Sequence, residues 1–251
     1  MLDKKLEELA LIIANSKRLV VFTGAGISTE SGLPDFRGPD GVWTRRDKGL
    51  PPRPMNKPWS EVDPNLAHTS IVELQNIGKL DFLISQNVDN LHLKSGIRQD
   101  LIAELHGNTT LMRCLKCDAR MTFKEANWDK SVWGTGYRTN PVYKNQPKCP
   151  KCGGRIINSI VNFGDSLPEK DLREAMEHSA KCDVFLVIGS SLVVTPAAHM
   201  PQIAIENGAK LIILNEGKTP FDNVADIRLW DKAGEIMSKV IKRVKEILKL
   251  S

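Results

Sequence analysis

Four of the five cysteines in this chain of 251 residues form two close pairs. Two residues separate Cys114 from Cys117 and Cys149 from Cys152, and 31 residues lie between the pairs. Thiolates in short turns such as CLKC and CPKCGG are typical ligands of tetrahedral zinc, and this spacing favours a metal site over disulfide bonds. Cysteine fills all four positions, so none is open for a catalytic water. The pattern predicts one structural zinc and a reducing compartment, whereas the lone Cys182 is expected to be a small buried residue.

Polar or glycine-containing segments follow five short apolar runs. The runs lie at 19–22, 80–84, 101–105, 184–188 and 211–214, and the segments after them read TGAGIS, SQNVDN, HGN, GSS and NEG. Helix-like segments separate most of the runs, which predicts an α/β fold with a Rossmann-like, doubly wound parallel sheet. The carboxyl ends of parallel strands share one edge, where ligands bind. We therefore expect the five segments to contribute to one site.

His106, in the third of these segments, is a candidate general base. Imidazole has an ordinary pKa of about 6.5, so a neutral histidine is an effective base near neutral pH. A single histidine at the end of a strand can equally be structural. From the residues alone, its expected place at the sheet edge leaves both interpretations open.

The segment TGAGISTESG after the first run is a candidate nucleotide site. Gly24 and Gly26 allow a tight turn and a close approach of backbone amides to a pyrophosphate. The regular dinucleotide fingerprint has a third glycine at position 29, where this chain has Thr29. A glycine turn that binds no ligand is therefore the alternative.

Two later segments add small and polar groups to the expected site. Gly189, Ser190 and Ser191 follow the fourth run and suit contact with a phosphate or a ribose. Asn215 follows the fifth run, where its amide could hydrogen-bond a ribose hydroxyl.

Helix signals lie between and after the runs. One helix is predicted to begin with Asp63 as N-cap and Pro64 as first helical residue and to end at Gly78, and a second, over 168–180, to begin at Pro168. At the C-terminus, apolar residues recur every four positions and predict an amphipathic helix: Ile236, Val240, Val244 and Leu248. Its lysines and Arg243 are expected to form a solvated face, so the net charge of +5 does not by itself indicate nucleic-acid binding.

Membrane and secretion signals are weak. The apolar run at 9–14 follows a charged helical pattern and lacks a small-residue cleavage site. No run approaches the roughly 18 residues that span a bilayer. We expect a soluble intracellular protein, cytoplasmic or, in a eukaryote, nuclear.

The motifs, taken in order, resemble those of the sirtuin family of NAD-dependent protein-lysine deacylases. They are GAGISTESGLPDFRG, SQNVDNLH, ELHGN, the two cysteine pairs, GDSLP, GSSLVVTP and ILNEG, and they extend over about residues 18–235. FRGPDGVWT, followed by only 19 residues before PNLAHTSI, resembles the nuclear class IV branch, in which the cofactor loop is shortened.

The resemblance implies roles for individual residues. His106 would be the general base and Asn87 a second catalytic residue. The residues implied to bind NAD, the co-substrate, are Gly24, Ala25, Gly26, Thr29, Phe36, Arg37, Trp43, Gln86, Asn87, Asp89, Gly189, Ser190, Ser191, Asn215, Glu216 and Ala233. The substrate, an acyl-lysine peptide or protein, would bind as an added β-strand at Val161, Phe163, Gly164 and Val193.

The reaction implied by the resemblance has two stages. The amide oxygen of the acyl-lysine attacks C1′ of the nicotinamide ribose and expels nicotinamide. His106 then helps to deprotonate a ribose hydroxyl, which leads to free lysine and O-acyl-ADP-ribose. Asn162 stands where much of the family has an apolar residue, so the acyl tunnel or peptide groove is expected to differ.

The resemblance also implies a division into parts. We expect a Rossmann-like NAD-binding domain at 1–35, 62–110 and 155–251, a cofactor-binding loop at 36–61 and a zinc-ribbon module at 111–154. Two alternatives stay open. The protein could be a mono-ADP-ribosyltransferase, or a catalytically weak NAD sensor whose zinc module binds nucleic acid or chromatin through aromatic and basic residues at 118–148.

Overall fold

The computed structural model describes residues 2–55 and 57–250, which form two compact units. The larger unit contains the described residues through 85, together with 91–103 and 174–250. The smaller unit contains residues 86–90 and 104–173, and includes the four paired cysteines. None of the helices in the described ranges is long and apolar enough to cross a membrane.

A six-stranded sheet forms the centre of the larger unit, in the order β3-β2-β1-β7-β8-β9. The strands are β1 (Leu19–Thr23), β2 (Leu80–Ser85), β3 (Ile102–Glu104), β7 (Val184–Ile188), β8 (Lys210–Leu214) and β9 (Ile227–Leu229). The pairings β2-β1, β1-β7, β7-β8 and β8-β9 are all parallel. The predicted fold class is confirmed. The short β9 was not predicted, because three residues centred on Arg228 give no apolar run.

The strand order reverses at the middle of this sheet. From the central β1 the chain proceeds to β2 and β3 on one side, and it later returns to β7 on the other side of β1. Such a reversal opens a crevice at the carboxyl ends of the two central strands, because their connections leave in opposite directions. The segments that follow β1 and β7 therefore lie at the topological switch point.

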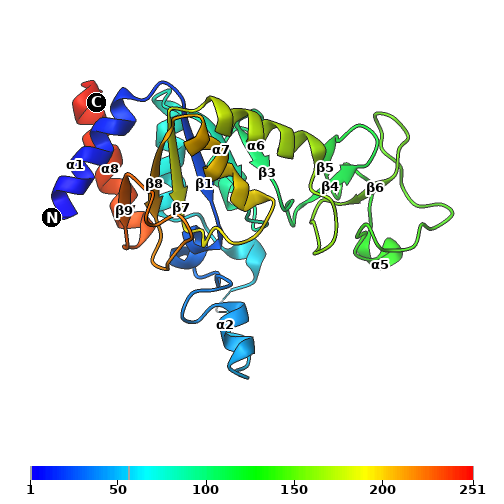
Figure 1. Cartoon of the computed structure of the whole chain (residues 1–251). Helices are drawn as coiled ribbons and strands as arrows, with labels where there is room; N and C mark the ends of the chain where they lie inside the picture. The colour runs from blue at the N-terminus through cyan, green and yellow to red at the C-terminus, as the bar shows by residue number, and fades with distance from the viewer. Residues whose placement is uncertain (1, 56, 251) are drawn as a thin grey trace. The chain divides into compact units, whose positions relative to one another are not determined.

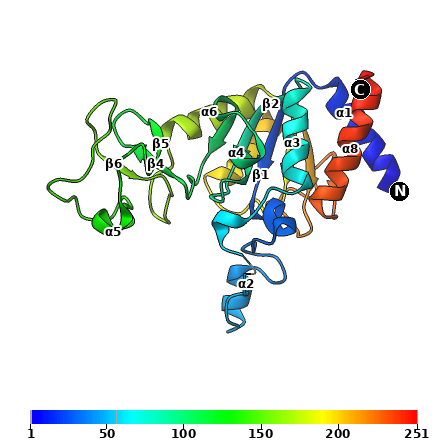
Figure 2. The same ribbon diagram turned by 180° about the vertical axis from the view of Figure 1, so that it is seen from behind.

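Helices cover both faces of the sheet. Figures 1 and 2 show α1 (Leu2–Asn15), α3 (Leu66–Asn76) and α8 (Ala233–Leu248) together on one face, and α7 (Met200–Glu206) on the other. All five side chains of β1 are buried, as expected for a strand covered on both sides. Leu19 and Val21 join the cluster beneath α1, α3 and α8, whereas Phe22 lies against Phe185 at 5.9 Å between ring centroids.

Further helical elements lie along the chain. They are the 3-10 helices η1 (Ala25–Ser31), η2 (Trp59–Glu61), η3 (Gln99–Leu101) and η4 (Ala197–His199), and the helices α2 (Val42–Asp47), α4 (Leu91–Ser95) and α6 (Glu169–Lys181). The C-terminal helix is confirmed: Ile236, Val240 and Val244 are buried.

The predicted start of α3 is wrong by two residues. Asn65 is the N-cap, and its side chain accepts hydrogen bonds from the amides of Ala67 and His68, while His68 Nδ1 accepts one from Asn65 N. This reciprocal pair stabilises the helix start more than the expected Asp63, which instead pairs with Lys94. The predicted helix start at Pro168 is one residue early, since α6 begins at Glu169.

The smaller unit contains a three-stranded antiparallel sheet. Its order is β5-β4-β6, with β4 at Leu111–Cys114, β5 at Arg120–Thr122 and β6 at Ile156–Asn158, and a short helix α5 at Lys130–Trp133. Met112, Trp128 and Ile156 form a small core together with Cys114 and Cys149. A core of this size is small, so a metal bound by the cysteines would add much of the stability.

Two buried histidines support the end of β1. His92 Nε2 hydrogen-bonds Thr23 Oγ1 at 2.9 Å, and the rings of His92 and His68 lie 5.0 Å apart. Asn65, which caps the helix that carries His68, donates from Nδ2 to Ile27 O at 2.7 Å. Burial lowers the pKa of His68 from 6.5 to about 4, and it lowers the pKa of His92 well below 6.5. Both imidazoles are therefore neutral in the folded protein at neutral pH.

We expect acid to destabilise the larger unit through these histidines. Their pKa is depressed in the folded state, so the unfolded chain binds the extra protons and stability falls as the pH drops from about 6.5 towards 4. A shift of this size in His68 corresponds to about 3 kcal/mol. Urea unfolding at several pH values should show a shallower loss in His68→Gln than in the wild type. The exposed His199 gives a matched control, and equal pH slopes for His68→Gln and His199→Gln would contradict the assignment.

Candidate active site

The turns after β1 and β7 contact each other backbone to backbone. Gly24 N donates to Ile188 O at 3.1 Å, and Gly26 N donates to Gly189 O at 2.8 Å. A Cβ atom on Gly26 would lie 2.8 Å from Gly189 Cα, and one on Gly189 would overlap Ile27 N. Gly189 also has a φ of +65°, which favours glycine. The three glycines thus allow two adjacent turns to meet at the switch point.

These hydrogen bonds argue against the expectation that the amides of the two glycines bind a pyrophosphate directly. The amides of Gly24 and Gly26 donate to carbonyl groups of the protein, so they do not have the geometry of direct pyrophosphate donors. Ala25 begins η1 directly between them, and Thr29 Oγ1 donates to Gly26 O at 2.9 Å. Ser190 is buried and its Oγ accepts from Leu192 N, while Ser191 is half-buried beside it.

An aromatic pair and an arginine gather in the loop after η1. The rings of Phe36 and Trp43 lie 5.2 Å apart, and the Arg37 guanidinium lies 4.2 Å above the Trp43 ring. Trp43 N donates to Phe36 O at 2.9 Å and closes the loop. Phe36 is 42% exposed, so this loop presents a large apolar ring next to a cation. Such a pair suits a ligand that combines a flat ring with phosphate groups.

The remaining predicted residues of the larger unit follow β8 or begin α8. Asn215 Nδ2 donates to Gly217 O at 2.9 Å, and Asn215 O accepts from Arg228 Nη1 at 2.7 Å. Glu216 is exposed, and Ala233 is buried as the first residue of α8. Helix α8 starts close to the glycine turn, because Gly234 N donates to Glu30 Oε1 at 2.8 Å.

In the smaller unit, His106 is held in one tautomer. Its Nδ1 lies 2.9 Å from Gln86 O, and because a carbonyl oxygen only accepts, Nδ1 must carry the proton. The second ring nitrogen, Nε2, then has the basic lone pair. Burial lowers the pKa of His106 below 6.5, and the bond to Gln86 O partly offsets this. His106 is therefore neutral at neutral pH, as a general base requires.

The segment that contains Gln86 is itself packed against the His106 turn. Asn87 is buried and Asp89 half-buried within this segment. Thr109 N donates to Val88 O at 2.9 Å. Gln86, Asn87, Asp89 and His106 thus form one group, which is what the sequence predicted for the segments after the second and third strands.

The predicted peptide-binding residues divide between the units. Val161 N donates to His106 O at 3.0 Å, so this segment begins beside the histidine. Phe163 is 84% exposed, and Gly164 has a φ of +89° in a turn closed by Asp165 N and Asn162 O. Val193 belongs to the larger unit and is 46% exposed.

The four paired cysteines are brought together as predicted. Their Sγ atoms all lie within 4.8 Å of one another, with Cys114 to Cys152 at 3.5 Å and Cys117 to Cys149 at 3.7 Å. Tetrahedral zinc with bonds of about 2.3 Å places its sulfur ligands about 3.8 Å apart. A Cβ on Gly154 would lie 3.0 Å from Cys114 Sγ, so glycine leaves room for the thiolates. The donor set and spacing are consistent with one structural zinc.

Some functional residues were missed from the sequence. The buried Glu104 and Asn108 flank His106, and Glu104 Oε1 accepts from Asn108 Nδ2 at 2.7 Å. The available signal was a polar residue two positions before His106 and another two positions after it, in a turn that the bond from Gly107 N to Glu104 O closes.

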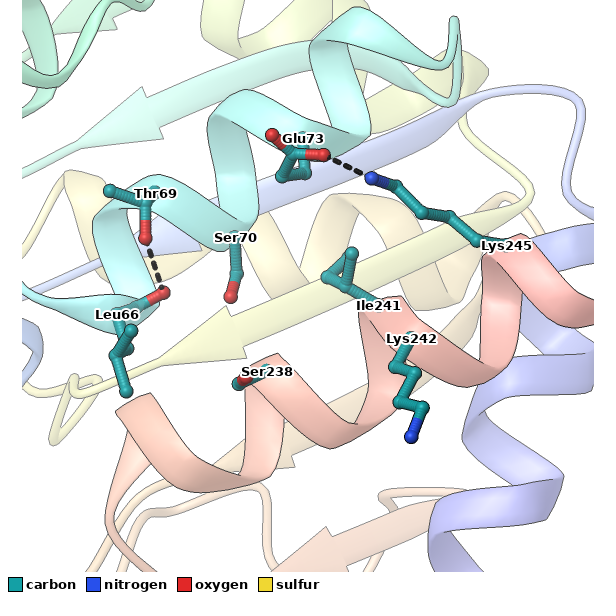
Figure 3. Close-up of a pocket in the computed structure, with 8 residues that line it drawn as sticks. All are labelled: Leu66, Thr69, Ser70, Glu73, Ser238, Ile241, Lys242 and Lys245. Atoms are coloured by element: carbon teal, nitrogen blue, oxygen red, sulfur yellow. Dashed lines mark hydrogen bonds and ion pairs between the residues drawn. The ribbon is translucent and has the colours of Figure 1, made fainter. Parts of the chain in front are cut away.

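A groove of about 430 Å³ lies elsewhere on the larger unit, between α3 and α8 (Figure 3). Glu73 and Lys245 form an ion pair at 2.5 Å across it, and Thr69 Oγ1 bonds to Leu66 O. None of the predicted site residues lines this groove.

Glycine turns at the switch point of a doubly wound sheet, an oriented neutral histidine and an inserted four-cysteine module define a class of nucleotide-binding proteins with a zinc ribbon. The chain belongs to the Sir2 family, since the family model matches residues 52–196. The family that the sequence motifs resembled is thereby confirmed.

Relatives and a solved structure agree with this assignment. NAD-dependent protein deacetylase SRT1 of Oryza sativa subsp. indica is 40% identical over 243 residues, 96% of this chain and 48% of that protein. The chain thus spans about half the length of this relative. NAD-dependent protein deacylase 2 of Archaeoglobus fulgidus is 38% identical and 98% of each chain is covered. A Sir2 structure with a deacetylated p53 peptide and 3′-O-acetyl-ADP-ribose has a TM-score of 0.71 and 33% identity, covering 98% of this chain and 99% of that one.

Gly189→Ala should separate the two turns. The added Cβ would overlap the backbone at Ile27, and the left-handed φ adds strain, so we expect both lower stability and loss of NAD binding. Gly208 is a matched control because it has a φ of +86° and no atom lies within 4 Å of the place a Cβ would take. Gly208→Ala should cost only about 1 to 2 kcal/mol and preserve NAD affinity. Urea unfolding and titration calorimetry measure the two effects, and equal NAD affinities for the two variants would contradict the contact's importance.

Cys152→Ser should remove the metal and loosen the smaller unit. One of four thiolates is lost, so we expect zinc well below one per chain by elemental analysis and early unfolding of that unit. Cys182→Ser is the control, because Cys182 lies outside the cluster and its Sγ contacts Ser179 O. A full zinc content in Cys152→Ser would argue against a four-cysteine site.

Proposed function

We propose that the protein is an NAD-dependent protein-lysine deacylase. It would transfer the acyl group of a modified lysine to ADP-ribose, releasing nicotinamide, the free lysine and O-acyl-ADP-ribose, with one water consumed. Family membership and the named activities of the relatives support this proposal. The structural observation that carries it is the bond between His106 Nδ1 and Gln86 O, which leaves Nε2 as the basic nitrogen.

The residues of the larger unit fit the nucleotide. Arg37 would pair with the pyrophosphate, and the exposed Phe36 ring would shield the reacting ribose from water. The turn residues Gly24, Ala25, Gly26, Thr29 and Gly189 to Ser191 would surround the phosphates and adenosine. Trp43, Asn215, Glu216 and Ala233 would complete the pocket for the adenosine side.

The residues of the smaller unit would act on the nicotinamide ribose of NAD. NAD supplies the electrophilic C1′ carbon and nicotinamide as leaving group. Asn87 would orient a hydroxyl or water without charge, while Gln86 and Asp89 lie around the ribose. His106 Nε2 would then accept the ribose hydroxyl proton. The resulting imidazolium would keep its Nδ1 bond to Gln86 O.

Backbone pairing would hold the peptide as an added strand. The segment at Val161, Phe163 and Gly164 and the segment at Val193 lie outside the strands of the described residues, and Phe163 and Val193 are exposed. Main-chain pairing reads little side-chain sequence, so we expect broad peptide tolerance. The NAD-binding domain, the loop at 36–61 and the zinc ribbon at 111–154 remain our proposed division of the chain.

We further propose that the protein belongs to the class IV branch. The support is the short sequence from Val42 to Pro64, whose described residues form the six-residue α2 and the three-residue η2. A short loop closes less fully over the cofactor, so slow deacetylation and activity on longer acyl chains are expected. Thiolate zinc ligands fit a reducing, intracellular environment.

Binding of a negatively charged partner is a second candidate function, for the zinc module. Residues 111–158 contain ten lysines and arginines against three aspartates and glutamates. Val132 and Val142 are exposed there, and Tyr143 lies against Trp133. An excess of basic residues beside an exposed aromatic ring favours binding to nucleic acid or chromatin.

The pure protein with NAD and a panel of acyl-lysine peptides tests the function. We expect peptide deacylation with one nicotinamide released per lysine freed. ADP-ribose attached to protein without deacylation would favour the transferase alternative. NAD binding without turnover would favour a sensor.

His106→Asn should separate the two stages of the reaction. The base is needed only after nicotinamide leaves, so exchange of labelled nicotinamide into NAD should persist while deacylation falls about 10²- to 10⁴-fold. The exposed His199→Asn variant should retain both activities. Loss of exchange in parallel with deacylation, or unchanged deacylation, would contradict the role of His106.

A further inference from the structure

A buried charged cluster lies two residues before His106. Glu104 Oε2 accepts from Arg120 Nη1 at 3.0 Å, and Arg120 Nη2 contacts Asp171 Oδ1. Asp171 Oδ1 also accepts from Glu104 N at 3.1 Å. The side chains of Glu104 and Asp171 are only 3% and 6% exposed. One guanidinium therefore holds two buried carboxylates.

The three members of the cluster come from three different elements. Glu104 ends β3, Asp171 lies in the first turn of α6, and Arg120 begins β5 of the four-cysteine module. Arg120 follows the metal loop directly, since Cys114 N donates to Ala119 O at 3.0 Å. The position of Arg120 therefore depends on the fold of the loop that gathers Cys114 and Cys117.

From Glu104 the contacts continue to the base itself. Asn108 Nδ2 donates to both Glu104 Oε1 at 2.7 Å and Asn90 Oδ1 at 2.9 Å. Asn90 ends the segment that begins with Gln86, whose carbonyl fixes the His106 tautomer. The Glu104 carboxylate thus anchors Asn108, and through it the segment that orients His106.

Opposing influences set the pKa of the Glu104 carboxyl group. Burial raises the pKa of Glu104 to about 7, Arg120 and the Asn108 bond oppose the rise, and Asp171 and Asp89 add to it. The positive charge of Arg120 thus favours the ionised form of Glu104.

We propose that Glu104 and Arg120 are positioning residues for His106, and that the ion pair between them transmits the fold of the four-cysteine module to the base. The inference rests on the proposed deacylase chemistry for its kinetic consequence. Its structural content, that the pair keeps the proton on His106 Nδ1, is independent of any activity.

Arg113 provides a matched control for Arg120. The two arginines are direct partners in the β4-β5 register, and both are in ion pairs, but Arg113 Nη1 binds Asp118 Oδ1 at 3.0 Å rather than Glu104. Arg113→Gln therefore removes a buried arginine from the same small sheet without touching the cluster.

The test compares Arg120→Gln, Arg120→Lys, Glu104→Gln and Arg113→Gln by zinc content, steady-state kinetics and the ¹⁵N imidazole signals of His106. We expect Arg120→Gln to retain one zinc per chain and lose kcat about 10- to 100-fold, with KM for NAD within about twofold. Arg120→Lys should recover part of the loss. His106 should shift from the Nδ1-protonated tautomer towards a mixture in Arg120→Gln and Glu104→Gln, but not in Arg113→Gln.

Three results would overturn the proposal: wild-type His106 signals in Glu104→Gln, full kcat in Arg120→Gln, or equal kinetic losses in Arg113→Gln and Arg120→Gln. Should Arg120→Gln fail to fold, the isosteric Glu104→Gln still decides, because it removes the charge and little volume. A wild-type protein without deacylase activity would refute the proposed function while the His106 spectra still test the ion pair.

Discussion

The contact between the turns after β1 and β7 is the constraint on which the larger unit depends. Gly26 N bonds to Gly189 O, and a Cβ at either glycine would overlap backbone of the opposite turn. The contact continues directly from the last pair of the β1-β7 register, Thr23 and Ile188. Because the strand order reverses at these two parallel strands, the contact also lies at the switch-point crevice, where ligands bind in folds of this class. The neutral His92 holds the side chain of Thr23 through a hydrogen bond.

A second constraint operates in the smaller unit, where the proposed role of His106 as a base requires its proton to stay on Nδ1. Gln86 O keeps that proton on His106 Nδ1, and burial keeps the ring neutral. Both effects need polar groups that are buried together with their hydrogen-bond partners. Such buried hydrogen bonds strengthen one another, whereas a buried polar group without a partner is costly. The zinc ligands and the Glu104 cluster provide the local rigidity that such an arrangement needs in a unit with a small apolar core.

Local sequence patterns, such as apolar runs and cysteine spacing, predicted much of this structure. Apolar runs located five strands of the large sheet, and cysteine spacing located the metal cluster, because each depends on residue type and order alone. The start of α3 was missed because Asn65 competes with Asp63 through a reciprocal bond to His68. The pairing of Arg120 with Glu104 joins residues 16 apart on different elements, and no periodicity reports it. The sequence likewise did not show that the Gly24 and Gly26 amides bond to carbonyl groups at the end of β7, because this depends on where β7 lies.

In the proposed reaction the acyl group moves from lysine to ADP-ribose. A peptide with a ¹³C-labelled acetyl-lysine, incubated with unlabelled NAD and the pure protein, tests this directly by mass spectrometry of the nucleotide products. We expect the label in O-acetyl-ADP-ribose, equimolar with released nicotinamide. Label appearing first as free acetate, or remaining on the peptide while nicotinamide is released, would contradict it.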